Sequence, residues 1–125
     1  MVAPSKTILV VDDDPFMRDI VTTQLSASGY AVVAAPRGEG VIEIFHHLKP
    51  AAIILDFAMP DMSGLEVLER LRREADGGRV PVLMLTAWSS DEAKVSTTRL
   101  GAKWLEKPVL GEKLLAEINE AVAGH

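Results

Sequence analysis

The chain has 125 residues, of which 48% are hydrophobic and 25% charged, and it contains no cysteine. This composition is typical of one globular domain that folds without cross-links, and it excludes disulfides and thiolate metal sites. The formal net charge of −5 disfavours direct nucleic acid binding by this chain. Its apolar runs are too short to span a membrane and none resembles a signal peptide, so we expect a soluble, cytoplasmic protein.

Short apolar segments alternate with amphipathic segments along the whole chain. The apolar segments fall at residues 7–11, 30–35, 51–55, 80–85 and around 103–105. Near-continuous runs of this kind are typical of strands that are covered on both faces in a parallel sheet.

Between these runs, apolar residues recur at helical spacing. The residues expected to share buried faces are Phe16, Ile20, Val21 and Leu25; Val41, Ile42, Phe45 and Leu48; Leu65, Leu68 and Leu71; and Leu110, Leu114, Ile118 and Val122. Asp14 before Pro15 predicts an N-cap for the first helix, and Gly29 is placed to end it.

Later helix starts show similar signals. Ser63 with Glu66, and Ser89 with Glu92, have the spacing of capping boxes. Leu110 occupies the expected N-cap of the last helix, where it cannot accept a hydrogen bond. The alternation of strands and helices predicts an α/β domain with right-handed crossovers and helices on both faces of the sheet. We expect a single domain over residues 1–125, with a core at about 6–123.

Polar residues directly follow four of the predicted strands. Asp12 and Asp13 follow the first, Asp56 the third, Thr86 the fourth and Lys107 the fifth. Since ligands bind beyond the carboxyl ends of parallel strands, these side chains are expected to converge at one edge of the sheet. Clustered carboxylates repel one another unless a cation lies among them, and oxygen ligands favour Mg²⁺.

Four segments carry a family resemblance, and they stand at residues 10–15 (VVDDDP), 55–64 (LDFAMPDMSG), 85–87 (LTA) and 104–108 (WLEKP). In order and spacing they resemble the signature segments of response-regulator receiver domains, over essentially the whole chain. The resemblance implies a flavodoxin-like (βα)5 fold. This fold is a three-layer sandwich around a five-stranded parallel sheet with strand order 2-1-3-4-5.

The resemblance also implies the chemical roles of individual residues. Asp56 matches the phosphoacceptor, and Asp12 and Asp13 match the acidic pair that holds Mg²⁺ together with Asp56. The backbone carbonyl of Ala58 would be a further metal ligand. Lys107 matches the lysine that pairs with the acceptor and then with the phosphoryl group.

A second set of residues resembles the family's switch. Thr86 would hydrogen-bond a phosphoryl oxygen, and Trp104 matches an aromatic residue that turns in behind it. The indole is larger than the more usual tyrosine or phenylalanine, so Trp104 either switches or lies as an amphipathic residue at the sheet's edge. Trp88 would modulate dephosphorylation, or it packs on the loop surface. The bond between Lys107 and Pro108 is expected to be cis.

The implied function is that of a receiver in a two-component phosphorelay. A sensor histidine kinase or phosphotransfer protein would donate the phosphoryl group to Asp56 in a Mg²⁺-dependent reaction. The segment from residue 91 to 122 would then signal to an output domain or effector protein. Apart from its own phosphorylation and dephosphorylation, we expect no enzyme activity.

Three alternatives remain at this level. A Mg²⁺-dependent phosphohydrolase would turn over small phosphate esters, although this short chain leaves no room for a cap domain. A flavin-binding electron carrier would be coloured, and carboxylates after the first strand would repel its phosphate. A degenerate receiver would act only as a docking module, although its acidic pair, acceptor, Thr and Lys are all present.

Overall fold

The computed structural model describes residues 6–74, 79–87 and 90–124, and within them strands and helices alternate strictly. The strands are β1 (Thr7–Val11), β2 (Ala31–Ala35), β3 (Ala52–Asp56), β4 (Val82–Thr86) and β5 (Lys103–Glu106). The helices are α1 (Pro15–Ala27), α2 (Val41–Leu48), α3 (Gly64–Arg73), α4 (Asp91–Arg99) and α5 (Gly111–Ala123).

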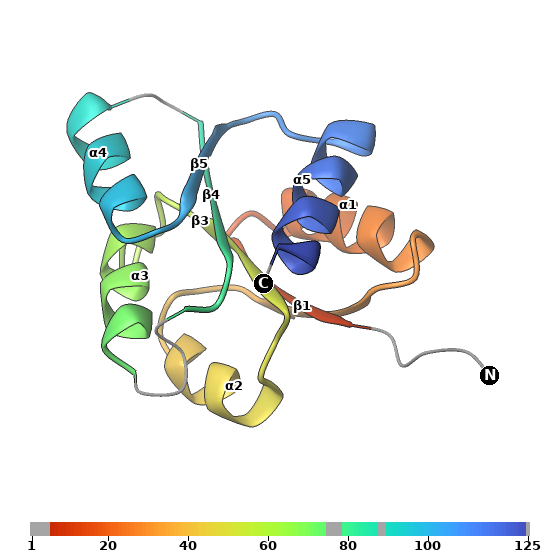
Figure 1. The fold of residues 1–125 in the computed structure, drawn as a ribbon, viewed down its shortest axis with the longest axis horizontal. Coiled ribbons are helices and arrows are strands. Elements are labelled where there is room, and N and C mark those ends of the chain that lie inside the picture. The colour runs from red at the N-terminus through yellow and green to blue at the C-terminus, as the bar shows by residue number, and fades with distance from the viewer. Residues whose placement is uncertain (1–5, 75–78, 88–89, 125) are drawn as a thin grey trace.

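All of these strands form one parallel sheet in the order β2-β1-β3-β4-β5, as predicted. The chain first moves from β1 outward to β2 and then crosses back to β3 on the other side of β1 (Figure 1). Strand order therefore reverses between β1 and β3. The carboxyl ends of these two strands are the place where parallel sheets of this kind bind ligands.

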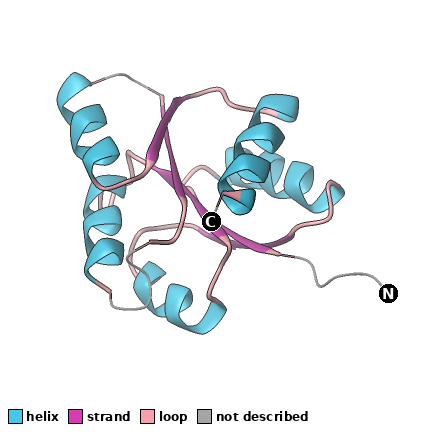
Figure 2. Cartoon of the chain, viewed as in Figure 1, coloured by secondary structure: helices cyan, strands magenta, loops and turns pink. Residues whose placement is uncertain are grey.

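Helices cover both faces of the sheet, α1 and α5 on one side and α2, α3 and α4 on the other (Figure 2). Successive residues of a strand point to opposite faces, so each central strand supplies both cores. The core under α1 and α5 includes Val10, Ile54, Leu83, Leu25 and Leu114. The core under the other three helices includes Val11, Leu55, Met84, Phe45 and Leu68.

The helix starts confirm two of the predicted caps. The Asp14 carboxylate accepts a hydrogen bond from the backbone N–H of Phe16 at 3.0 Å. The Ser63 hydroxyl accepts one from the backbone N–H of Glu66 at 3.2 Å. Gly29 directly follows Ser28, the C-cap residue of α1, and takes a positive φ of 95°, a backbone conformation that favours glycine.

The cap predicted at Ser89 is wrong, because the N-cap of α4 is Ser90. The Ser90 backbone is extended, and its hydroxyl accepts from the N–H of Ala93 at 3.3 Å. Two serines stand next to each other here, and it is the second that directly precedes the helix start at Asp91 and so occupies the N-cap.

Phe16 and Leu110 also depart from the predicted buried faces. Phe16 is 70% exposed, and Leu110, which lies at the N-cap of α5 and not within the helix, is 36% exposed. At 3.6 residues per turn, Phe16 lies about 140° around α1 from Val21 and about 180° from Leu25, the two residues that are buried. Phe16 lies in the first turn of α1, directly after the loop that leaves the carboxyl edge of the sheet. Phe16 is therefore exposed because it lies on the side of α1 that faces away from the core, and the predicted four-residue face was too wide.

Candidate functional site

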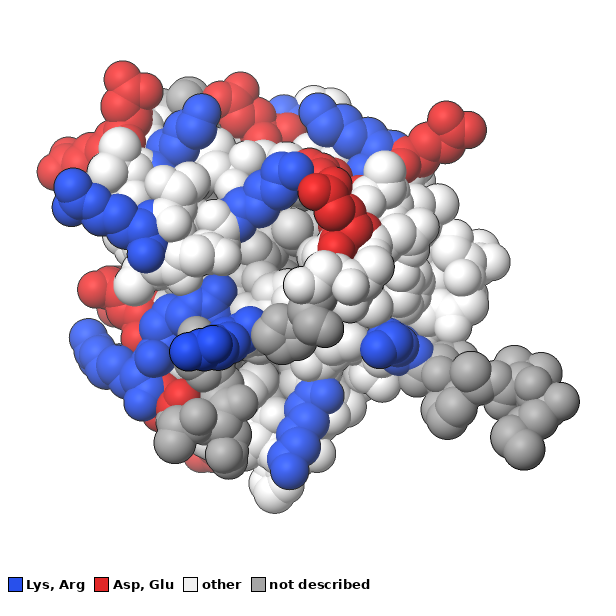
Figure 3. All heavy atoms as spheres, viewed as in Figure 1, with Lys and Arg blue, Asp and Glu red and all other residues white. Residues whose placement is uncertain are grey.

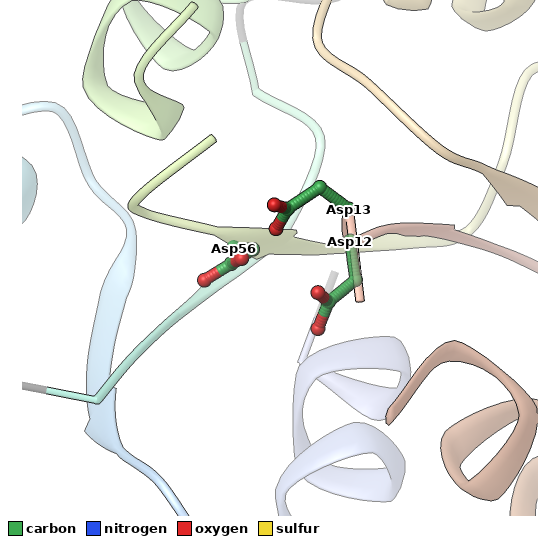
Figure 4. Close-up of side chains that lie close together, drawn as sticks. All are labelled: Asp12, Asp13 and Asp56. Carbon is green, nitrogen blue, oxygen red and sulfur yellow. The ribbon is translucent and has the colours of Figure 1, made fainter. Parts of the chain in front are cut away.

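Three carboxylates meet at the carboxyl ends of β1 and β3 (Figure 4). One ligand oxygen from each of Asp12, Asp13 and Asp56 lies within 4.8 Å of the others. Asp12 is 4% exposed and Asp56 5% exposed, whereas Asp13 is more open to solvent. The predicted convergence of these residues is therefore present, at the point where strand order reverses.

Asp12 is held in place by contacts on several sides. Its Oδ1 accepts the backbone N–H of Asp14 at 2.9 Å, and its own N–H donates to the carbonyl of Ala35 at 3.1 Å. The Arg18 guanidinium donates to the Asp12 carbonyl at 2.8 Å. Since both the backbone and the carboxylate of Asp12 are fixed, the site is organised before any ligand arrives.

Lys107 extends from the end of β5 into this acidic cluster. Its Nζ lies 3.2 Å from Asp12 Oδ2 and 3.3 Å from Asp56 Oδ1. The predicted pair with Asp56 is therefore present, and Asp12 shares the same ammonium. The bond from Lys107 to Pro108 is cis, as expected.

The charges around Asp56 are out of balance. Burial, followed by the charge of Asp12, raises the pKa of Asp56 to about 7, although Lys107 lowers it. A hydrogen bond with the Asp13 carboxyl group contributes to this rise. Burial alone would lower the pKa of Lys107, but the charges of Asp56 and Asp12 outweigh burial and raise it. Burial is the largest cause of the Asp56 shift, but the negative charges of neighbouring carboxylates contribute to both shifts, and a cation would offset those charges.

Thr86 and Trp104 lie on the neighbouring strands β4 and β5. Thr86 is fully buried, and its carbonyl accepts the backbone N–H of Lys107 at 2.6 Å. Trp104 is 8% exposed, and its ring meets the Phe57 ring edge-on at a centroid distance of 5.6 Å. The larger indole is therefore accommodated inward, under α4, and does not lie open at the sheet's edge.

The packing around Trp104 leaves two polar atoms without hydrogen bonds. Neither the Trp104 Nε1–H nor the Thr97 hydroxyl of α4 has a partner, although both atoms are buried. An unpaired buried polar group costs about 1–3 kcal/mol. The contact between α4 and β5 is therefore less favourable than its apolar packing alone would suggest.

The loop after Asp56 is pressed against the start of α3. A Cβ on Gly64 would lie 2.4 Å from the Asp56 carbonyl oxygen and 2.7 Å from Met84 Sδ. The N–H of Gly64 donates to the Phe57 carbonyl at 2.7 Å. Only glycine allows this approach, so Gly64 fixes the path of the loop that contains Ala58.

Trp88, the predicted modulator of dephosphorylation, lies outside the described residues. Asp61 was missed: its carboxylate accepts the N–H of Gly38 at 3.3 Å and that of Glu39 at 2.8 Å. No local motif could reveal Asp61, since its partners lie 22 and 23 residues earlier in the chain.

The molecular surface shows both signs of charge. On the face in Figure 3, Lys and Arg side chains are scattered among uncharged ones, with Asp and Glu between them.

None of the helices in the described part of the chain is long and apolar enough to cross a membrane.

Solved structures resemble the whole fold. The chemotaxis protein CheY4 of Vibrio cholerae is 32% identical, with a TM-score of 0.87 over 94% of this chain and 98% of that one. A response regulator receiver domain protein from Methanospirillum hungatei is 30% identical, with a TM-score of 0.89 over 96% of this chain and 95% of that one.

Curated proteins match in sequence. A probable transcriptional regulator, ycf27 of Porphyridium aerugineum, is 38% identical over 92% of this chain and 47% of its own length. The response regulator MprA of Mycobacterium sp. (strain KMS) is 39% identical over 90% of this chain and 48% of its own length. The chain thus spans about half the length of these relatives. The family model of the response regulator receiver domain matches residues 8–119. With its fold, its acidic edge and its relatives in agreement, the chain belongs to the response regulator receiver domains of two-component signalling.

Proposed function

We propose that Asp56 accepts a phosphoryl group and that this modification is the signal the domain transmits. The proposal rests on one observation above all: a buried carboxylate at the end of β3 faces Asp12, Asp13 and the ammonium of Lys107. This arrangement combines a nucleophile with charges that can orient and neutralise an incoming phosphoryl group. We also propose that residues 1–125 form a single receiver domain.

The donor set fits Mg²⁺. Asp12, Asp13 and Asp56 offer oxygen atoms within 4.8 Å of one another, and hard cations prefer oxygen ligands. The backbone carbonyl of Ala58 would complete the protein's share, and Mg²⁺ commonly retains several waters. When bound, the ion supplies positive charge that neutralises the carboxylates and the oxygens of the phosphoryl group.

In the transfer itself, an oxygen of the Asp56 carboxylate attacks the phosphorus of a phosphohistidine. The new O–P bond gives an acyl phosphate, and the N–P bond breaks with its electron pair left on the imidazole nitrogen. The Lys107 ammonium, which pairs with the Asp56 carboxylate before the transfer, would then stabilise the negative charge of the phosphoryl group. Hydrolysis of the acyl phosphate restores Asp56, so the domain turns over only its own modification.

Transmission of the signal is assigned to α4, β5 and α5. Thr86 would donate its hydroxyl to a phosphoryl oxygen, and Trp104 would respond to that movement. The unpaired Nε1–H of Trp104 supports this part of the proposal, because a buried donor without a partner makes the inward packing less stable than it could be. Phosphorylation can then shift the balance between two packings of α4.

The partners follow from the relatives' names. Several are transcriptional regulators about twice as long as this chain, so an output domain or effector protein would receive the signal. The phosphodonor would be a sensor histidine kinase or a phosphotransfer protein.

Intact-mass measurement after incubation with acetyl phosphate and Mg²⁺ tests the acceptor. We expect one added phosphate on the wild type, and none on Asp56→Asn or on wild type treated with excess chelator. A wild type that stays unmodified, or an Asp56→Asn variant that gains the phosphate, would refute the assignment. Repeated turnover of a small phosphate ester would favour a phosphohydrolase instead.

A further inference from the structure

The β2–α2 loop (residues 36–40) and the β3–α3 loop (residues 57–63) are tied together by the side chain of Asp61. Its two carboxylate oxygens accept separate backbone N–H groups, Oδ2 from Glu39 at 2.8 Å and Oδ1 from Gly38 at 3.3 Å. We call this contact between the two loops the loop seam. These bonds lower the pKa of Asp61, that from Glu39 most, so the carboxylate stays charged in neutral solution.

Close packing accompanies these hydrogen bonds. Gly38 is buried, and a Cβ there would lie 2.9 Å from Val67 Cγ2 and 3.2 Å from Met62 Cβ. The backbone of one loop therefore lies directly on side chains of the other and of α3. Gly40, the N-cap of α2, has no side chain that could accept a hydrogen bond. Because Asp61 accepts from the two residues just before Gly40, it also places a negative charge near the positive end of that helix.

The β3–α3 loop is thus anchored at both ends and across its middle. The loop begins directly after Asp56, the last residue of β3, and its end is held by the hydrogen bond from the Gly64 N–H to the Phe57 carbonyl. Between these ends lies Ala58, which is exposed and has no anchor of its own among the described contacts. Asp61, three residues later, ties this part of the loop to the neighbouring one.

From this geometry we infer that Asp61 is a positioning residue, which holds the Ala58 carbonyl where it can bind Mg²⁺. The inference rests on the proposed function, because it assigns Ala58 as a metal ligand. Residues that orient metal ligands typically change metal affinity by 10–100-fold when they are removed. Asp61 acts through the backbone and not on a ligand directly, so we expect the lower end of that range.

Two substitutions and a matched control separate positioning from charge. Asp61→Ala removes both acceptors. Asp61→Asn keeps one acceptor for Glu39, but its NH₂ group opposes the N–H of Gly38. Glu39→Ala removes one negative charge from the same seam and leaves the backbone N–H that Asp61 accepts.

Mg²⁺ binding is measured in a titration with tryptophan fluorescence as the signal. The rate of labelling by acetyl phosphate is measured separately, at low and at saturating Mg²⁺. Asp61→Ala should weaken Mg²⁺ binding about tenfold, Asp61→Asn by less, and Glu39→Ala should match wild type. Labelling by Asp61→Ala should be slow at low Mg²⁺ and approach the wild-type rate at saturation. A merely structural role would not produce this recovery.

Hydrogen exchange gives a second readout that needs no metal. The amides of Gly38 and Glu39 should exchange faster in Asp61→Ala than in wild type or in Glu39→Ala, since the Asp61 acceptors protect them. If Asp61→Ala does not fold, Asp61→Asn against Glu39→Ala makes the same comparison.

Equal Mg²⁺ affinity in the Asp61 variants and Glu39→Ala would overturn the inference, and so would a defect that saturating Mg²⁺ does not repair. A wild type that binds no Mg²⁺ and takes no phosphate would instead refute the proposed function. The exchange rates of Gly38 and Glu39 would still report whether the loop seam exists.

Discussion

Asp56 is subject to opposing requirements. As a nucleophile it must be ionised, yet burial and the neighbouring carboxylates favour its protonated form and raise its pKa from 3.8 to about 7. A proton on Asp56 and a cation in the site relieve the same repulsion, so they compete. The metal-free protein at pH 8 therefore holds a charged Asp56 at a cost in folding free energy.

This cost gives a pH-dependence of stability. Between pH 4 and 7 the native state binds the Asp56 proton more tightly than the unfolded state does, so metal-free wild type should lose stability as the pH rises through this range. Asp56→Asn cannot ionise, and its advantage over wild type should grow by about 2 kcal/mol from pH 5 to pH 8. Urea unfolding in chelator at both pH values measures it. An advantage that is the same at both pH values would contradict the raised pKa of Asp56.

Trp104 shows which part of a residue's role can be predicted from the sequence and which part depends on the fold. Its place at the family's aromatic position is evident from the spacing to Lys107, but its inward packing depends on the space under α4. That space is partly lined by the Phe57 ring. Neither residue's neighbours can be read from a local pattern, so the sequence left open an orientation that the fold decides.

At the level of elements, the start of α5 explains a residue that the sequence could only mark as unfavourable. Leu110 at its N-cap offers no side-chain acceptor. The backbone N–H of Gly111 donates instead to Oε1 of Gln24 in α1, at 3.0 Å. The cap is therefore supplied from a residue 87 positions earlier, which no capping pattern could detect.

Substitution of Gln24 tests this long-range cap. Gln24→Leu has a similar shape but no acceptor, and it should lower the free energy of unfolding by about 1 kcal/mol. Gln24→Glu keeps the acceptor and adds a charge that suits a helix N-terminus, so it should be at least as stable as wild type. Chemical denaturation of both variants makes the comparison. Equal losses in the two would indicate that packing, and not the hydrogen bond, is what Gln24 contributes.

The start of α3 provides a second element-scale prediction. Gly64→Ala would force a Cβ into the Asp56 carbonyl oxygen, 2.4 Å away, and overpacking of this kind costs about 1–3 kcal/mol. The shift of the Asp56 backbone should also slow labelling by acetyl phosphate. Ser63→Ala removes only the cap of the same helix, so it should destabilise the protein by about 1 kcal/mol and leave labelling intact. If the two variants label equally fast, Gly64 serves only helix packing.

For the molecule as a whole, strand–helix alternation predicts the α/β class and nearly all of the element positions. The order of the strands was not readable from that pattern, because short apolar runs do not specify their neighbours. It followed from the family resemblance, and the observed order matches it. The site residues could be predicted from the sequence for a physical reason: they lie at strand ends, which parallel pairing brings to one edge of the sheet.

Metal binding should then appear in the stability of the entire domain. At a Mg²⁺ concentration of tenfold Kd, the free energy of unfolding should rise by about 1.4 kcal/mol, and chelator should reverse the change. Thermal unfolding in MgCl₂ against NaCl of equal ionic strength separates binding from screening. No difference between these salts at millimolar Mg²⁺ would argue against the site.

The order of the site's charges along the chain also has a consequence for synthesis. The carboxylates of Asp12, Asp13 and Asp56 leave the ribosome well before Lys107, which follows the last strand. At about 5–20 residues per second, the acidic half of the site exists for several seconds without its ammonium. A nascent chain that pairs β1 with β3 in that interval brings like charges together unaided. If Mg²⁺ binds these carboxylates as we propose, it would act as their counterion during synthesis, before Lys107 is added.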